Sequence, residues 1–167
     1  MKHSPALVLS MCLATCLGLA SCNSAPKHPP VWQNAEVAVP SENVLWAVSG
    51  QEMQYLGFPV GSDADPAALV MRSGWHMHLA PFRGQGYREK AEVRFTRVAP
   101  ERFKLEVRVA REDNMDLKNP IDPRSAEWKE APDSVDVARV LMQRIRARLG
   151  DKLEVGTPTA EKTPARR

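Results

Sequence analysis

Two stretches in the middle of the chain alternate apolar and polar side chains, and this pattern constrains the fold most. Apolar residues occupy every second position of residues 91–95 and of residues 103–109, and mostly charged residues lie between them. Successive side chains of a β-strand point to opposite faces, so each stretch predicts a strand with one buried face. Because the two strands are close in sequence, they predict an antiparallel hairpin.

Charged residues on the outer face select the register of this hairpin. A five-residue loop over residues 98–102 places Arg94 opposite Glu106 and Glu92 opposite Arg108. A three-residue loop would instead place Arg94 opposite Arg108. Facing opposite charges stabilise a strand pair by roughly a few tenths of a kcal/mol, and like charges destabilise it similarly. We therefore expect the five-residue loop.

Helical patterns flank the hairpin on both sides. Ser41 can cap a helix that runs to about Leu56, and Gly57 is suited to end it. A second helix is expected from about Val135 to Leu149, where apolar residues recur on one side.

The region between the first helix and the hairpin predicts further strands. Residues 58–60 predict a short edge strand, residues 61–66 a turn, and residues 68–79 a strand that Gly74 can break. Packing both helices on one face of an antiparallel sheet of about four strands buries all of these apolar sides. The sequence therefore predicts an α+β fold, a two-layer sandwich.

The first 22 residues have the pattern of a targeting signal. An apolar run over residues 6–20 is shorter than the roughly 20 residues of a membrane-spanning helix, and it leads into Leu19-Ala20-Ser21-Cys22. This motif resembles the lipobox of bacterial lipoproteins. The resemblance implies cleavage before Cys22 and attachment of acyl chains such as palmitate to Cys22. The next residue is Asn23 rather than Asp, which by the same resemblance favours the outer membrane over the inner one.

All three cysteines of the 167-residue chain lie in this signal. Cys12 and Cys16 would leave with the signal and Cys22 would carry lipid. No cysteine then remains for a disulfide, a cysteine-based zinc site or a thiol nucleophile.

Proline content and polarity set the expected domain boundaries. We expect a signal peptide over residues 1–21, a lipidated Pro-rich tether over 22–40, the α+β domain over 41–150 and a disordered tail over 151–167.

His76 and His78 are candidate metal ligands. They lie two residues apart in a predicted strand and therefore share one face, where they could bind copper or zinc. Two His are too few for a closed zinc site, and Met77 would point to the other face. The favoured alternative is that both His are polar residues on the solvent side of a half-buried strand.

The sequence does not present a catalytic constellation. The acidic pairs Asp63/Asp65 and Glu112/Asp113 lie in turn or strand-end contexts, and residues 83–86 do not have the setting of a phosphate-binding loop. We therefore expect a protein that is not an enzyme and needs no cofactor. The net charge of +3 comes from Lys and Arg interspersed with Asp and Glu, which argues against nucleic acid as a partner.

A long connection over residues 112–133 joins the hairpin to the second helix. Loops of this length are often functional, and Trp128 within it is a candidate anchor for a protein partner. The favoured alternative is that Trp128 and Ile121 fold back over a sheet edge, with a short helical turn at residues 125–129.

The order of elements also resembles a known family. Leu45-Trp46, Leu56-Gly57-Phe58-Pro59-Val60, an Asp-containing turn and a closing helix after a hairpin resemble helix-grip domains. These domains occur in BamC-type lipoproteins of the outer-membrane assembly machinery. Small lipoproteins of the lipopolysaccharide-export kind share a helix-sheet-helix layout.

These resemblances imply a non-enzymatic envelope assembly or interaction module. It would be lipid-anchored to the outer membrane, face the periplasm and bind an envelope protein. The alternative is a ligand- or metal-binding envelope protein that uses His76 and His78.

Overall fold

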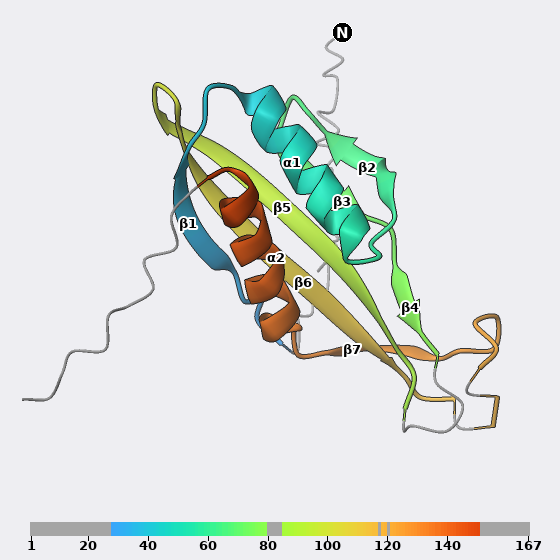
Figure 1. The fold of residues 1–167 in the computed structure, drawn as a ribbon. Coiled ribbons are helices and arrows are strands. Elements are labelled where there is room, and N and C mark those ends of the chain that lie inside the picture. Colours follow the sequence, from blue (N-terminus) through green and yellow to red (C-terminus); the bar gives the residue numbers. More distant parts are fainter. Residues whose placement is uncertain (1–27, 80–84, 117, 120, 151–167) are drawn as a thin grey trace, which may run out of the picture.

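The computed structural model describes residues 28–79, 85–116, 118–119 and 121–150. Within these ranges the chain forms two helices and one antiparallel sheet of seven strands, with both helices on the same face of the sheet (Figure 1). The elements in chain order are β1 (Gln33–Ala38), α1 (Glu42–Tyr55), β2 (Val60–Asp65), β3 (Val70–Ser73), β4 (His76–His78), β5 (Tyr87–Ala99), β6 (Arg102–Asn114), β7 (Trp128–Ala131) and α2 (Val135–Arg148). The α+β class is as expected, but the sheet is larger than the predicted four strands.

The hairpin of β5 and β6 forms the centre of the sheet, whose strand order is β1-β6-β5-β3-β2. The predicted register is confirmed, because Arg94 lies opposite Glu106 and Glu92 lies opposite Arg108. The turn itself is tighter than expected. The pairing is irregular just after Arg97, but it continues to a last pair between Ala99 of β5 and Arg102 of β6. Only residues 100 and 101 are left to close the hairpin.

The two short strands β4 and β7 extend this sheet at one end of the hairpin. β4 pairs with the beginning of β5, and β7 pairs with the end of β6. The long connection before α2 is thus partly a strand.

The expected boundary between tether and domain is wrong, because residues 33–38 form strand β1. This strand pairs with the first half of β6. Val37 and, just after the strand, Val39 are each 3% exposed and belong to the core. In β1 the alternation of apolar and polar residues depends partly on the small residue Ala35, and the strand lies between prolines. The segment therefore resembled a Pro-rich tether.

The predicted turn over residues 61–66 is also wrong, because most of this segment belongs to β2. The turn begins at Asp65, whose Oδ1 accepts hydrogen bonds from the backbone N–H groups of Ala67 and Ala68, both at 3.0 Å. Aspartate commonly stabilises turns in this way. The predicted break at Gly74 is confirmed, since β3 ends at Ser73 and β4 begins at His76.

Both helices start and end close to the predicted residues. Ser41 precedes α1, and its side chain accepts a hydrogen bond from the backbone N–H of Val44 at 3.4 Å. Gly57 follows α1 with a φ of +85°, a conformation that glycine adopts without strain. No helix within the described residues is long and apolar enough to cross a membrane.

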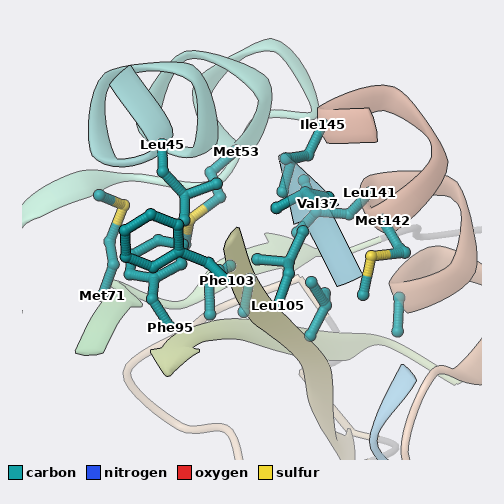
Figure 2. Packing of buried hydrophobic residues seen from close by; sticks show 14 of the residues in the cluster. Val37, Leu45, Met53, Met71, Phe95, Phe103, Leu105, Leu141, Met142 and Ile145 are labelled. Atoms are coloured by element: carbon teal, nitrogen blue, oxygen red, sulfur yellow. The ribbon is translucent and has the colours of Figure 1, made fainter. Parts of the chain in front are cut away.

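The core lies between the helices and the sheet. Leu45 and Met53 of α1 and Ile145 of α2 meet the inner residues of β5 and β6 (Figure 2). The alternate residues of these strands that were expected to be buried are each at most 5% exposed: Ala91, Val93, Phe95, Phe103, Leu105, Val107 and Val109.

A buried carboxylate joins the two helices. Glu52 of α1 is 4% exposed, and its Oε2 accepts a hydrogen bond from Nε of Arg144 on α2 at 2.7 Å. A charge with this little exposure is stable only when it is paired.

Candidate functional site

The lipobox and its Cys22 lie outside the described residues, so the structure provides no geometry for them. The other predicted site residues, which are His76, His78 and Trp128, all lie at the end of the sheet where β4 and β7 are added.

Trp128 belongs to a patch on the face of the sheet opposite the helices. The guanidinium carbon of Arg88 lies 4.3 Å from the centre of the Trp75 ring and 4.6 Å from that of the Trp128 ring. Nε of Arg88 also donates a hydrogen bond to Oε2 of Glu112 at 2.7 Å. Arg88 is therefore held in one orientation between two indole rings.

Met77 completes this surface. It lies directly opposite Arg88 in the pairing of β4 with β5, and it is 46% exposed. We refer to Trp75, Met77, Arg88 and Trp128 as the β4 patch. Sequence reasoning found Trp128 but missed its neighbours, because the pairing of β4 with β5 decides which side chains surround it.

The expectation that Trp128 and Ile121 fold back over a sheet edge fits Trp128 and is wrong for Ile121, and the role of Trp128 as a partner anchor stays a prediction. Trp128 lies in β7 and is half-buried, whereas Ile121 is 57% exposed. The expected helical turn at residues 125–129 is replaced by turns before residue 126 and by the start of β7.

Asn114 holds the base of this connection. It is 1% exposed, and its Oδ1 accepts hydrogen bonds from the backbone N–H groups of Asp116 and Glu127 at 2.9 and 3.1 Å. The Asp116 carboxylate accepts hydrogen bonds from the backbone N–H groups of Lys118 and Asn119, which lower its pKa.

The two histidines lie on the opposite side of β4 from the one we expected. His76 packs edge-on against Phe58 with ring centres 5.6 Å apart, and His78 stacks on Tyr87 with ring centres 4.4 Å apart. Met77, expected on the buried side, points to the helix-free face instead. The pairing of β4 with β5 sets this orientation, because it places His78 opposite Tyr87 and His76 opposite the buried Glu89.

Glu89 is 4% exposed and lies between a histidine and a serine. Its Oε2 is 3.5 Å from Nε2 of His78, and its Oε1 accepts a hydrogen bond from the hydroxyl of Ser134, the residue that precedes α2. We refer to His76, His78, Tyr87, Glu89 and Ser134 as the histidine cluster.

The electrostatic environment of the cluster affects His76 most. Its partial burial lowers its pKa, the neighbouring His78 lowers it further, and Glu89 raises it. The two imidazole rings are 4.2 Å apart between their centres.

The order of groups in the cluster does not match a nucleophile-activating relay. A serine nucleophile needs an imidazole or another base aimed at its hydroxyl, with the acid beyond the base. Here the carboxylate of Glu89 lies between Ser134 and His78. A groove of about 500 Å³ runs beside the cluster and is lined by Glu89, Ser134 and Asp136, among others.

Within the part of the chain that the structure describes, the histidines are not joined by further ligands in an arrangement suited to a metal. Among the described residues, no group of three or more His, Cys, Asp or Glu side chains is placed to hold a metal ion.

Comparisons with known proteins do not assign the chain to a family. No known protein family matches the sequence, and no curated protein matches it either. Among solved structures, the adenylate sensor from AMP-activated protein kinase, in complex with 5-aminoimidazole-4-carboxamide 1-β-D-ribofuranotide, is similar to this chain at 18% identity. The match covers 66% of this chain and 93% of that chain with a TM-score of 0.42. A TM-score of this size carries no argument about fold or function.

Proposed function

We propose that this protein is a lipoprotein of the outer membrane that faces the periplasm and acts as a non-enzymatic interaction module. Cys22 would carry the lipid, and the β4 patch would bind an envelope protein. The lipobox resemblance supports the anchor, and the resemblance to helix-grip domains of assembly lipoproteins supports the interaction role. We assign the partner-binding role to the β4 patch because Met77 is half-exposed and lies opposite Arg88 there.

The composition and order of the β4 patch suit a protein partner. Tryptophan, arginine and methionine are enriched at protein interfaces, where side chains that are ordered before binding lose less entropy. The stacking of Arg88 between Trp75 and Trp128 supplies this order in the free protein. The partner would contribute apolar side chains that cover Met77.

Site-specific photocrosslinking in the native envelope tests this proposal. A photoreactive residue at position 77 should form a discrete crosslinked product with one envelope protein. Val140 on α2 is the matched control, because it is similarly exposed, at 44% against 46% for Met77, but lies on the helix side. Equal products from both positions, or no product at position 77, would contradict the proposal.

The metal-binding alternative has less support. Both imidazole rings are engaged in ring contacts, with His78 between His76 and Tyr87.

A further inference from the structure

We propose that the histidine cluster is an acid-sensitive switch that holds β4 in place at neutral pH and releases it when the cluster takes up a second proton. The inference rests on the proposed function of the β4 patch, because it concerns the regulation of that surface. Released β4 would no longer present Met77 beside Arg88.

The position of β4 depends on the side chains of the histidine cluster. The strand is only three residues long, and within the described residues its strand partner is β5. His76 and His78 fix its inner side, and Met77 between them forms part of the β4 patch on the outer side. Any movement that separates the two rings from their partners therefore also moves Met77.

His76 fits closely against the turn that follows α1. A Cβ atom at Gly57 would lie only 2.7 Å from Cε1 of the imidazole, so the ring occupies the space that glycine leaves free. On its other faces the ring contacts Phe58 and His78. Neither Gly57 nor Phe58 has a charge that could stabilise an imidazolium.

The charged groups around the cluster can accommodate one imidazolium but not two. Glu89 on β5 is the carboxylate within 3.5 Å of His78, and its other oxygen accepts from the uncharged Ser134 before α2. On the far side of the Tyr87 ring lies the guanidinium of Arg111 from β6, at 4.2 Å from the ring centre.

The remaining charged groups beside the cluster do not supply a second carboxylate for a second imidazolium. The carboxylate of Asp113, opposite Tyr87 on β6, is paired with Arg111 at 2.9 Å. Asp136 in the first turn of α2 is paired with Arg139 at 2.8 Å. Protonation of both rings would put two positive charges on imidazoles whose centres are 4.2 Å apart, beside the single carboxylate of Glu89. This repulsion favours opening of the stack.

The direction of the pH effect follows from the environment of His76. Burial and the neighbouring His78 lower its pKa in the folded protein. Well above the ordinary histidine pKa of about 6.5, both the closed and the open states hold His76 neutral. As the pH falls below that value, the open state takes up the proton first. Acid therefore favours the open state.

Hydrogen exchange of the full-length protein in detergent tests the switch without any partner. Between about pH 7.5 and about pH 5, after correction for intrinsic exchange rates, protection of the β4 backbone should fall on the order of tenfold. Protection of the central β5 and β6 segments should stay constant. A His76→Phe variant keeps an aromatic ring against Phe58 and should lose the pH effect, whereas the control His28→Phe should retain it.

A second variant keeps the test decisive if His76→Phe does not fold. Glu89→Gln removes the carboxylate that raises the pKa of His76, so release of β4 should begin at higher pH than in the wild type. Unchanged protection of wild-type β4 in acid, or equal pH dependence in the wild type and both variants, would refute the switch.

Crosslinking separates failure of the switch from failure of the proposed function. If β4 protection is independent of pH while position 77 still crosslinks to a partner, the switch alone is wrong. If β4 is released in acid but position 77 never crosslinks, the switch holds and the proposed function is wrong.

Discussion

Replacing Arg144 with Met tests whether the buried carboxylate of Glu52 couples the two helices. Arg144 donates to Glu52 at 2.7 Å, and its guanidinium carbon lies 3.8 Å from the centre of the Tyr55 ring. Arg148 also approaches Glu52, but at 3.6 Å and with its side chain 63% exposed. The substitution removes the closer of two cations from a carboxylate that remains buried.

The expected loss of stability follows from these contacts. A hydrogen bond to a charged group contributes roughly 1.5–3 kcal/mol, and an exposed cation–π contact contributes roughly 0.5–1 kcal/mol. The Arg144 side chain is 34% exposed, so water can reach Glu52 after the substitution and the smaller values apply. We expect Arg144→Met to lower the free energy of unfolding by about 2 kcal/mol. For a domain of this size the melting temperature should fall by roughly 8 °C.

Urea unfolding of the purified protein, followed by tryptophan fluorescence and circular dichroism, measures this change. The midpoint should shift with little change in the dependence of free energy on urea. Arg148→Met is the matched control, because it changes the same residue type on the same helix with the same partner. It should cost about 0.5 kcal/mol or less.

Two results would refute the reasoning. One is an equal loss of stability in Arg144→Met and Arg148→Met. The other is a coupling free energy below about 0.5 kcal/mol in a double-mutant cycle of Glu52→Gln with Arg144→Met, because contacting residues should be coupled more strongly.

Three further changes have defined outcomes. Gly57→Ala should destabilise the protein by about 2 kcal/mol in urea unfolding, because φ at this position is +85° and the added Cβ would contact His76. The control Gly150→Ala has a φ of +77° but its Cβ would meet nothing within 4 Å, so it should cost only about 1 kcal/mol. Equal losses in the two variants would contradict the contact with His76. Because the pKa of His76 is lowered, stability should fall as the pH drops below about 6.5, and His76→Phe should flatten this fall in unfolding curves across that range. Cys22→Ser should move the protein from the membrane fraction to the soluble fraction and abolish labelling with palmitate; retention of both would exclude lipidation at this residue.

Regular local patterns were sufficient to predict the central elements. The alternating residues of β5 and β6 share one face over many positions, and the charges Arg94 and Glu106 selected the register that the structure has. The helix bounds followed from Ser41 and Gly57, whose preferences are local. These predictions succeeded because each depends on residues close in sequence or on one simple pairing.

The candidate site depended on short elements that lack such a pattern. β4 has three residues, and either of its sides could have been the buried one. The pairing with β5 placed His76 and His78 inward and Met77 outward, which reversed our expectation. β1 was missed for a related reason, since its burial requires the edge of β6 as a partner.

The sequence by itself therefore determined the α+β class, the central hairpin with its register and both helices, whereas lipidation at Cys22 stays a prediction. Only the tertiary structure decided which side chains meet: Glu52 with Arg144, 92 residues later, and Glu89 with Ser134, 45 residues later. The physical reason is that backbone periodicity is a local property of the chain. A buried charge, by contrast, is stabilised by a partner that only the folded chain brings within hydrogen-bonding distance.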